Sequence, residues 1–349
     1  MSRLGVVVAL ALCVQATASA RTLRVSPGGS VTAAVNSASE GDTVLVEPGT
    51  YQERFSLSGK DIVLRGEMGA EVTTIHGRLP NQKGNVLTFE FVTRNMVIED
   101  LTITGGLFND VHPESVGTAI YINRGSPTIQ RCILRDNDAN AGGGVAAYFF
   151  SKPLIRDCWV GYNKGGGIFV ETHDGDGVGD VAEIYNTYVV RNTGFGISAI
   201  KGAEVIVENC TVAYNSGDGV RAEITSGFGA AKTYVTVRNS IITDNNGGGI
   251  IRHDVGVCFT LGCNDVWNNQ LGEWVGTNPG DPCFPGRGGG SNSIEPVYVD
   301  VGSDNFLLAQ NSPLFGLCVP GGCGALGAEN ECSTSVSRRS WSRIKELYR

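Results

Sequence analysis

Three aspartates stand among glycines in one short segment, Asp174-Gly-Asp176-Gly-Val-Gly-Asp180. Carboxylates spaced along a flexible glycine backbone can converge on Ca²⁺, which takes about six to eight oxygen ligands. Glu171 or Glu183 could complete the ligand set. The pattern predicts a calcium site at Asp174, Asp176 and Asp180, and a solvated acidic turn is the alternative.

A second candidate site consists of charged residues that recur near the same place in successive units of a sequence repeat. They are Lys201, Arg221, Glu223, Arg252, His253 and Asp254. A basic group within such a cluster can act in proton transfer. Charged residues are also common at the ends of surface strands, so a solvated surface is the alternative.

Aromatic residues form a third candidate site, because the repeat places them on outward positions. They are Trp159, Tyr162, Tyr188 and Tyr214. Exposed aromatic rings can stack on sugar rings, which predicts a carbohydrate-binding ladder. Packing of the same rings under loops is the alternative.

The elements that must position these residues come from a repeat whose segments each end on asparagine. The segments are RCILRDN (131–137), DCWVGYN (157–163), NTYVVRN (186–192), NCTVAYN (209–215), NSIITDN (239–245) and CNDVWNN (263–269). Their terminal asparagines are 23 to 30 residues apart. A unit of this length indicates a solenoid.

Each segment is expected to be a short strand. Three residues before the asparagine stands an aliphatic residue, and five residues before it a small one. Both point inward, because side chains alternate along a strand. The residue between them, four before the asparagine, is expected to face outward. The inward residues are Leu134, Val160, Val189, Val212, Ile242 and Val266, with Cys132, Cys158, Thr187, Cys210, Ser240 and Asn264.

The asparagines and the glycines after them are expected to form corners. Asparagine tolerates a left-handed backbone, and its amide can bond to the asparagine of the next coil. The glycines of 165–167 and 247–249 allow a turn that a β-carbon would obstruct. A strand, an Asn-Gly corner, a second strand and a loop then make one coil of an all-β parallel β-helix.

The N-terminal region predicts a capping element for this solenoid. In the stretch SVTAAVNSASEGDTVLVEPGTYQERFSLSGKDIVLRGE (30–67), Ser30 is a candidate N-cap. Val31, Ala34, Val35 and Ala38 form one apolar stripe of a short helix. Such a helix would cover the open end of the core.

This stretch and the repeat together resemble the right-handed parallel β-helix (pectin-lyase-like) superfamily. Its members open with such a helix, followed by strands similar to GDTVLVEPGTY (41–51). Residues 263–276 and 293–316 are similar to the closing coils of secreted bacterial β-helix proteins. The resemblance covers about residues 22–332. It is specific for the fold and says little about the reaction, because many chemistries share the scaffold.

The resemblance also implies what the charged cluster could do. Polysaccharide lyases of this fold use a basic residue to abstract a proton next to a uronate carboxylate, which Ca²⁺ or another cation neutralises. Loops of variable length can wall a groove on a solenoid. The candidate insertions are 105–117, 171–182 and 222–233, whereas the connection after Ile200 is short.

The chain is expected to comprise three parts. Residues 1–20 read as a secretory signal peptide, with Arg3 before an apolar run and Ala18-Ser19-Ala20 as the cleavage site. Residues 21–332 form the β-helix. The basic tail 333–349 could cap the solenoid, dock on a surface or secretion partner, or stay disordered. We therefore expect a secreted monomer, extracellular, periplasmic or on the cell surface, without a transmembrane segment.

The cysteines agree with an oxidising compartment. Cys132, Cys158 and Cys210 occupy inward positions and are expected to be buried free thiols. From about residue 258 the chain is expected to be disulfide-rich, through Cys258, Cys263, Cys283, Cys318, Cys323 and Cys332. A zinc site is the alternative for these six, but no CxxC pair is present.

Charge and motifs exclude other classes. Residues 21–332 hold 21 basic and 34 acidic residues, a net charge of −13 that disfavours nucleic acid. No phosphate-binding glycine motif or nucleophile elbow is present. We expect extracellular or cell-surface carbohydrate recognition or a structural surface role. The alternative is a polysaccharide lyase or glycoside hydrolase acting on an acidic (uronate) polysaccharide. No cofactor is certain, and Ca²⁺ is the one candidate.

Overall fold

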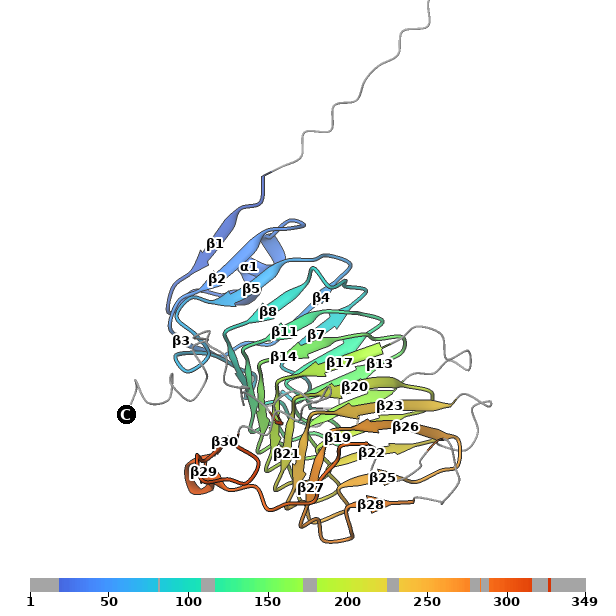
Figure 1. Cartoon of the computed structure of the whole chain (residues 1–349). Helices are drawn as coiled ribbons and strands as arrows, with labels where there is room; N and C mark the ends of the chain where they lie inside the picture. The colour runs from blue at the N-terminus through green and yellow to red at the C-terminus, as the bar shows by residue number, and fades with distance from the viewer. Residues whose placement is uncertain are drawn as a thin grey trace, which may run out of the picture.

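The chain folds into three parallel sheets that wind around one narrow core (Figure 1). The computed structural model describes residues 19–80, 82–107, 117–171, 181–224, 232–276, 283, 289–315 and 326–327. Sheet A has ten strands, and sheets B and C have nine each. Successive strands along the chain pass from sheet A to sheet B to sheet C, so each coil contributes one strand to every sheet.

The strands of each sheet lie in register from coil to coil. Sheet A consists of β1 (Thr22–Val25), β2 (Thr43–Val46), β5 (Val63–Gly66), β8 (Val97–Glu99), β11 (Thr128–Gln130), β14 (Leu154–Arg156), β17 (Val181–Tyr185), β20 (Glu204–Glu208), β23 (Thr233–Arg238) and β26 (Val257–Gly262). Sheet B consists of β3 (Gly49–Tyr51), β6 (Thr73–His76), β9 (Thr102–Thr104), β12 (Ile133–Arg135), β15 (Trp159–Gly161), β18 (Tyr188–Val190), β21 (Thr211–Ala213), β24 (Ile241–Thr243) and β27 (Asp265–Trp267). Sheet C consists of β4 (Phe55–Ser58), β7 (Leu87–Glu90), β10 (Ile120–Asn123), β13 (Val145–Tyr148), β16 (Ile168–Glu171), β19 (Ile197–Ile200), β22 (Val220–Glu223), β25 (Ile250–Arg252) and β28 (Trp274–Val275).

The predicted all-β parallel β-helix is confirmed, but each coil has three strands where two and a loop were expected. The missed strands are those of sheet A, such as β20 with the sequence EVIVE. Its valines are buried and its glutamates lie partly in solvent, as the period of two requires. A single left-handed residue, such as Asn209 with φ 52°, makes the corner before the sheet B strand. A one-residue corner gave no loop signal in the sequence.

The predicted interior column is confirmed. The aliphatic residues three before each asparagine are fully buried, as Leu134, Val160 and Val212 show. The small residues five before it are buried too, and Cys132, Cys158 and Cys210 are free thiols. The side chains five residues before each asparagine are thus smaller than the aliphatic ones three residues before it.

The asparagines form the predicted ladder along the solenoid axis. Each side-chain amide donates to the side-chain oxygen of the next at 2.8–3.0 Å, through Asn137, Asn163, Asn192, Asn215, Asn245 and Asn269. The left-handed conformation expected of the asparagines themselves is wrong. It belongs to the preceding residue, such as Tyr162 with φ 56° or Tyr214 with φ 57°. That residue turns the chain, so the asparagine side chain points inward to its neighbours.

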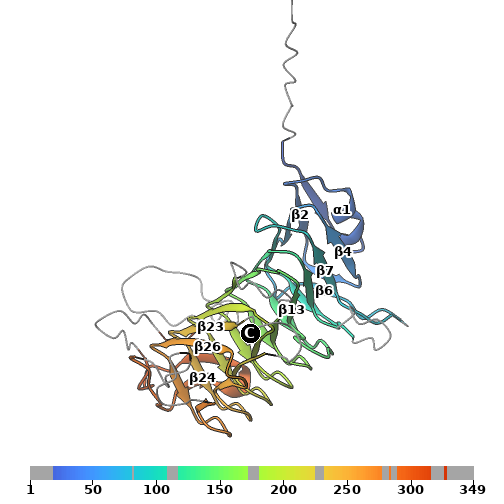
Figure 2. The ribbon, with the colours of Figure 1, turned by 90° about the vertical axis from the view of Figure 1, so that its right-hand side faces the viewer.

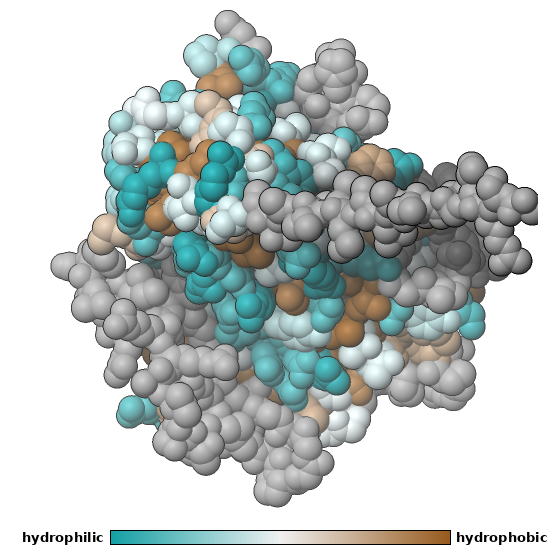
Figure 3. All heavy atoms as spheres, turned by 90° about the horizontal axis from the view of Figure 1, so that it is seen from above, coloured by the Kyte–Doolittle hydropathy of each residue, from teal (hydrophilic) through white to brown (hydrophobic). Residues whose placement is uncertain are grey.

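The predicted capping helix is α1 (Val31–Ser37). The Ser30 side chain accepts a hydrogen bond from the backbone N–H of Ala33 at 3.1 Å, which confirms the N-cap. Val31 and Val35 are buried against the first coil. Seen from above, at the end that carries α1 in Figure 1, hydrophobic described residues form small areas among hydrophilic ones (Figure 3).

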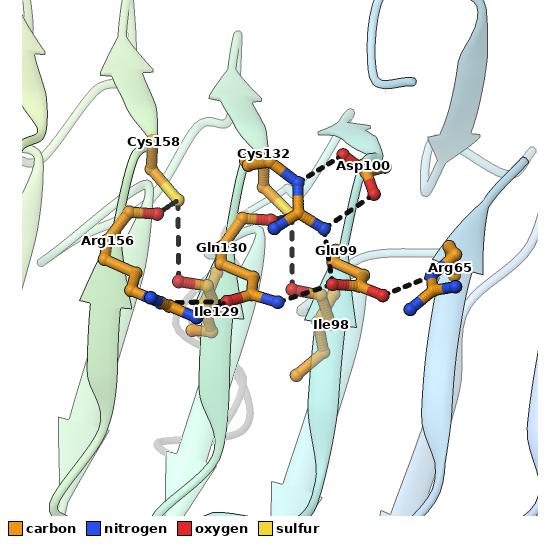
Figure 4. Close-up of polar contacts among 10 residues, drawn as sticks. Arg65, Ile98, Glu99, Asp100, Ile129, Gln130, Cys132, Arg156 and Cys158 are labelled. Carbon is orange, nitrogen blue, oxygen red and sulfur yellow. Dashed lines mark hydrogen bonds and ion pairs between the residues drawn. The ribbon is translucent and has the colours of Figure 1, made fainter. Parts of the chain in front are cut away.

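The outward face of sheet A carries a network of paired polar groups (Figure 4). The Glu99 carboxylate, with its side chain 2% exposed, accepts hydrogen bonds from Arg65, Gln130 and Arg131. Burial raises the pKa of the Glu99 carboxyl, but these hydrogen bonds outweigh it and hold the pKa below its usual value. Arg156 donates to Gln130 and continues the network. These groups satisfy one another, so this face is a structural surface.

The outward face of sheet B is covered by the C-terminal part of the chain. Strands β29 (Tyr298–Asp300) and β30 (Asn305–Leu308) pair antiparallel, with the short helix η1 (Val301–Ser303) between them. Phe306, Leu308 and Tyr298 pack in one hydrophobic cluster with outward residues of sheet B. Figure 1 shows this segment beside β21 and β27. Trp159 and Tyr188, which were expected on an open outward face, are therefore buried.

The cysteines near the C-terminal end agree in part with the predicted disulfide-rich region. Cys258 and Cys283 form a disulfide, and Cys263 is also disulfide-bonded. Cys318, Cys323 and Cys332 lie outside the described residues, as do residues 1–18 of the predicted signal peptide and the tail 333–349. In the described part of the chain, no helix is long and apolar enough to span a membrane.

Candidate functional site on sheet C

The outward face of sheet C brings most of the predicted charged cluster together. Strands β16, β19, β22 and β25 are neighbours in this sheet. Val220 and Ala222 point into the core, so Arg221 and Glu223 of β22 point outward. Lys201 directly follows β19, one coil before them.

Arg221 is held in a defined position by two neighbours on the preceding coil. Its Nε donates a hydrogen bond to the Ser198 hydroxyl at 3.1 Å. Its guanidinium carbon lies 4.4 Å from the centre of the Phe195 ring, a cation–π contact. No carboxylate among the described residues lies within ion-pair distance of this guanidinium. Its two Nη groups make no hydrogen bond to any residue within the described ranges.

Lys201 and His253 each face a carboxylate. The Lys201 ammonium lies 2.7 Å from Glu171, and both side chains are largely buried. Nε2 of His253 lies 3.6 Å from Oδ2 of Asp218, and the histidine side chain is 43% exposed. Asp218 is held by the backbone N–H of Gly248 at 3.1 Å. The histidine is thus oriented by a carboxylate while it remains open to solvent.

Two predicted members of the cluster have other surroundings. Arg252 is paired in register with Ala222, which faces the core, and is only 8% exposed. Its Nε donates to the carbonyl of Gly276 at 3.2 Å. The expectation that Arg252 shares a surface with Arg221 is wrong, because strand alternation places it on the opposite side. Asp254 accepts a hydrogen bond from the backbone N–H of Ile224 at 2.7 Å, which links two successive coils.

A row of aromatic rings that sequence reasoning missed supports the charged cluster. The ring centres of Tyr121 and Tyr148 are 5.4 Å apart, those of Tyr148 and Phe169 5.3 Å, and those of Phe169 and Phe195 6.2 Å. Burial, and then the Glu171 carboxylate, raises the pKa of Tyr148 well above its usual range. The signal was present at the residue after the aliphatic one that follows each glycine corner, such as Phe169 after Ile168.

The residues of the predicted sugar-stacking ladder lie on or beside the strands of sheet B. Trp159 and Tyr188 are 8% and 6% exposed, so the exposure expected of them is wrong. The ring centre of Phe306 lies 6.4 Å from that of Tyr188 and 5.8 Å from that of Tyr214. Tyr162 is 38% exposed, and its hydroxyl donates to Asp304 at 2.9 Å. Sugar binding by Tyr162 and Tyr214 remains a prediction.

The calcium candidates Asp174, Asp176 and Asp180 lie outside the described residues. The segment that holds them leaves sheet C after β16 and enters sheet A at β17, and 225–231 connects the same two sheets after β22. Residues 108–116 connect sheet B to sheet C, whereas the other two candidate insertions connect sheet C to sheet A. Within the described ranges, no group of three or more His, Cys, Asp or Glu side chains could hold a metal ion.

Comparisons with known proteins agree with this architecture. The family model described as "Right handed beta helix region" matches residues 118–277. The solved structure of pectate lyase Pel9A superposes with a TM-score of 0.60 at 13% identity and covers 90% of this chain and 97% of that one. At this identity the likeness shows the fold alone.

Two further solved structures are similar at lower scores. An alginate lyase from Paenibacillus sp. str. FPU-7 has 16% identity and a TM-score of 0.47, covering 78% of this chain and 99% of that one. The mannuronan C-5 epimerase AlgE4 A-module of Azotobacter vinelandii has 18% identity and a TM-score of 0.43, covering 70% and 73%. No curated protein matches the chain in sequence. The family model and the three-sheet solenoid identify the chain as a right-handed parallel β-helix protein with the pectin-lyase-like fold.

Proposed function

We propose that the chain binds an acidic polysaccharide along the outward face of sheet C. The observation that carries the proposal is the Arg221 guanidinium, held by Phe195 and Ser198, whose two Nη groups have no partner among the described residues. Guanidinium groups bind carboxylates in a bidentate manner, so a uronate carboxylate is a fitting partner. Because the face spans successive coils, an extended ligand fits it better than a single sugar.

Two further observations support an extracellular polysaccharide ligand. Pel9A is by its name a pectate lyase, and this chain has the same fold. The disulfide between Cys258 and Cys283 is typical of an oxidising compartment, which agrees with the signal peptide proposed at residues 1–20. Both observations support a secreted protein that binds a polysaccharide.

Elimination at a uronate residue is the second candidate function, and the His253–Asp218 pair favours it. Since Asp218 faces Nε2, Nδ1 of His253 could take the proton from the carbon next to the carboxylate. The C–H electron pair would form a carbon–carbon double bond as the glycosidic bond breaks, and the leaving oxygen would take up a proton. Arg221 would neutralise the carboxylate.

Calorimetric titration with polygalacturonate, alginate and a neutral glucan tests the binding proposal. We expect the two polyuronates to bind and the glucan not to bind. Arg221→Ala should weaken polyuronate binding about tenfold or more, because a charged hydrogen-bond pair is lost. Arg238→Ala on sheet A, which pairs with Glu208, is the matched control and should bind like the parent. Equal binding by both variants would contradict the proposal.

The elimination is tested by ultraviolet absorbance of the unsaturated product, with Ca²⁺ and with chelator. We expect His253→Ala to abolish any product while polyuronate binding remains. A parent protein that binds polyuronates and yields no product under either condition is a binding module. A chelator effect on the parent that Asp174→Asn/Asp176→Asn removes would support calcium in that loop.

A further inference from the structure

The corner between sheets C and A carries phenylalanines in a backbone conformation that disfavours them. Phe91 follows β7 with φ 52°, and Phe149 and Phe150 follow β13 with φ 48° and 55°. Left-handed φ favours glycine, asparagine and aspartate, and it strains bulky residues. The preceding coil has Gly59 with φ 64° at the same corner, as local preference dictates.

Burial does not explain these phenylalanines. Phe91 is 57% exposed and Phe150 is 38% exposed, although apolar side chains of this size usually pack inside. The turn after β13 is pinned by the buried Ser151 hydroxyl, which donates to the Tyr148 carbonyl and accepts from the backbone N–H of Gly125. Left-handed residues form corners along the whole solenoid, so it is the exposure of these two rings together with the strain that points to a ligand.

A cation stands between the rings. Arg124 holds the equivalent corner after β10 with φ 50°, and backbone hydrogen bonds join it to the neighbouring corners. Its side chain is exposed, and its guanidinium carbon lies 5.1 Å from the centre of the Phe149 ring. No described carboxylate is within ion-pair distance of Arg124. Glu90, on the strand before it, accepts a hydrogen bond from the Asn123 amide at 3.0 Å.

This corner continues the face on sheet C. Tyr148 of the aromatic row is the residue before Phe149, and their ring centres are 6.3 Å apart. Coils advance by about 4.8 Å each, so a polysaccharide lying along the axis would pass the corner residue Phe91, then Arg124, and then the pair Phe149 and Phe150, of which Phe150 is the more exposed ring. Figures 1 and 2 show β7 and β13 along one side of the solenoid, and β10 lies between them in sheet C.

We propose that Phe91, Arg124 and Phe150 form a second subsite of an acidic polysaccharide, which extends the Arg221 site toward the N-terminal end. The rings stack on sugar faces, and the guanidinium binds a carboxylate of the residue between them. This inference rests on the proposed function. The inference adds to that function the residues that make the affinity depend on the length of the oligosaccharide.

The test compares short and long oligouronates on the full chain by calorimetric titration. We expect Phe91→Asn/Phe150→Asn to bind a disaccharide like the parent and to bind long oligouronates about five- to tenfold more weakly. Its melting temperature should equal or exceed that of the parent, because asparagine accepts the left-handed backbone. Tyr234→Asn, another exposed aromatic at 40% on sheet A, is the control and should leave both affinities unchanged.

Each contrary outcome is distinct. Unchanged affinity for long oligouronates, with Arg221→Ala still weakening them, would overturn the subsite and leave the proposed function intact. A clear fall in melting temperature would show that the phenylalanines stabilise the fold, which overturns the argument from strain. A parent that binds no oligouronate of either length would overturn the proposed function and this inference together.

Discussion

The outward faces of sheets B and C use similar residues for different ends. On sheet B, Arg191 lies 5.4 Å from the Tyr214 ring centre and pairs with Asp304 at 2.8 Å. On sheet C, Arg221 lies over Phe195 in a similar contact and has no carboxylate partner among the described residues. The C-terminal segment gives Arg191 the carboxylate of Asp304, and Arg221 has no such partner among the described residues. An arginine stacked on an aromatic ring is therefore a candidate ligand site only where the protein itself supplies no carboxylate partner.

Both faces depend on the same interior column of side chains. A substitution in this column should therefore have the largest effect on stability. Val212→Asp should cost about 5 kcal/mol or more, because it buries an unpaired charge. Urea unfolding followed by circular dichroism measures the loss. Wild-type stability of this variant would mean that the strand register is wrong.

The next effect separates the two faces. Phe306→Ala should destabilise the chain by about 3–5 kcal/mol, since the buried ring contacts Tyr188, Tyr214 and Tyr298. Arg221→Ala should change the melting temperature little, because surface arginines contribute little to stability. Thermal melts of both variants check the contrast. Equal destabilisation by the two would mean that the sheet C face is structural as well.

A smaller effect concerns pH and the covered face. Asp265 on β27 is fully buried; its Oδ1 accepts a hydrogen bond from the Ile294 backbone at 2.9 Å, and its Oδ2 has no hydrogen-bond partner in the described part of the chain. Burial, and then Glu273, raises the pKa of Asp265 to about 7, above that of the unfolded chain. The folded chain binds the proton more tightly, so this stabilisation is complete below about pH 4 and is lost as pH rises through 7.

Asp265→Asn should remove this part of the pH dependence. Above pH 7 the variant should be more stable than the parent by a few kcal/mol and should therefore have a higher melting temperature. Near pH 4 the two proteins should have similar melting temperatures. Melting temperatures between pH 4 and 8 give the comparison. Parallel curves for parent and variant would show that Asp265 carries no charge effect on the fold.

Sequence periodicity predicted the interior well, because the column needs aliphatic and small residues at fixed offsets from an asparagine. Val212 and Cys210 are buried as expected, and the asparagine amides bond along the axis. The outward face of sheet B could not be predicted. Trp159 is covered by a segment more than 130 residues later in the chain, and no local pattern announces that contact.

The candidate site was predicted only in part. Arg221, Glu223 and His253 come together because successive coils repeat the same positions. Arg252 was misplaced because the strand alternation was not followed to its last residue. The rings of Tyr148 and Phe169 could not be predicted from the asparagine register, because that register fixes outward positions only for the sheet B strands.

Amide hydrogen exchange with and without a long oligouronate tests the central claim most directly. The account predicts slower exchange in β16, β19, β22 and β25 and at residues 87–91 and 145–150. It predicts no change in β29 and β30, which cover sheet B. Protection of β29 and β30 with none on sheet C would contradict the claim that the open face of sheet C is the ligand site.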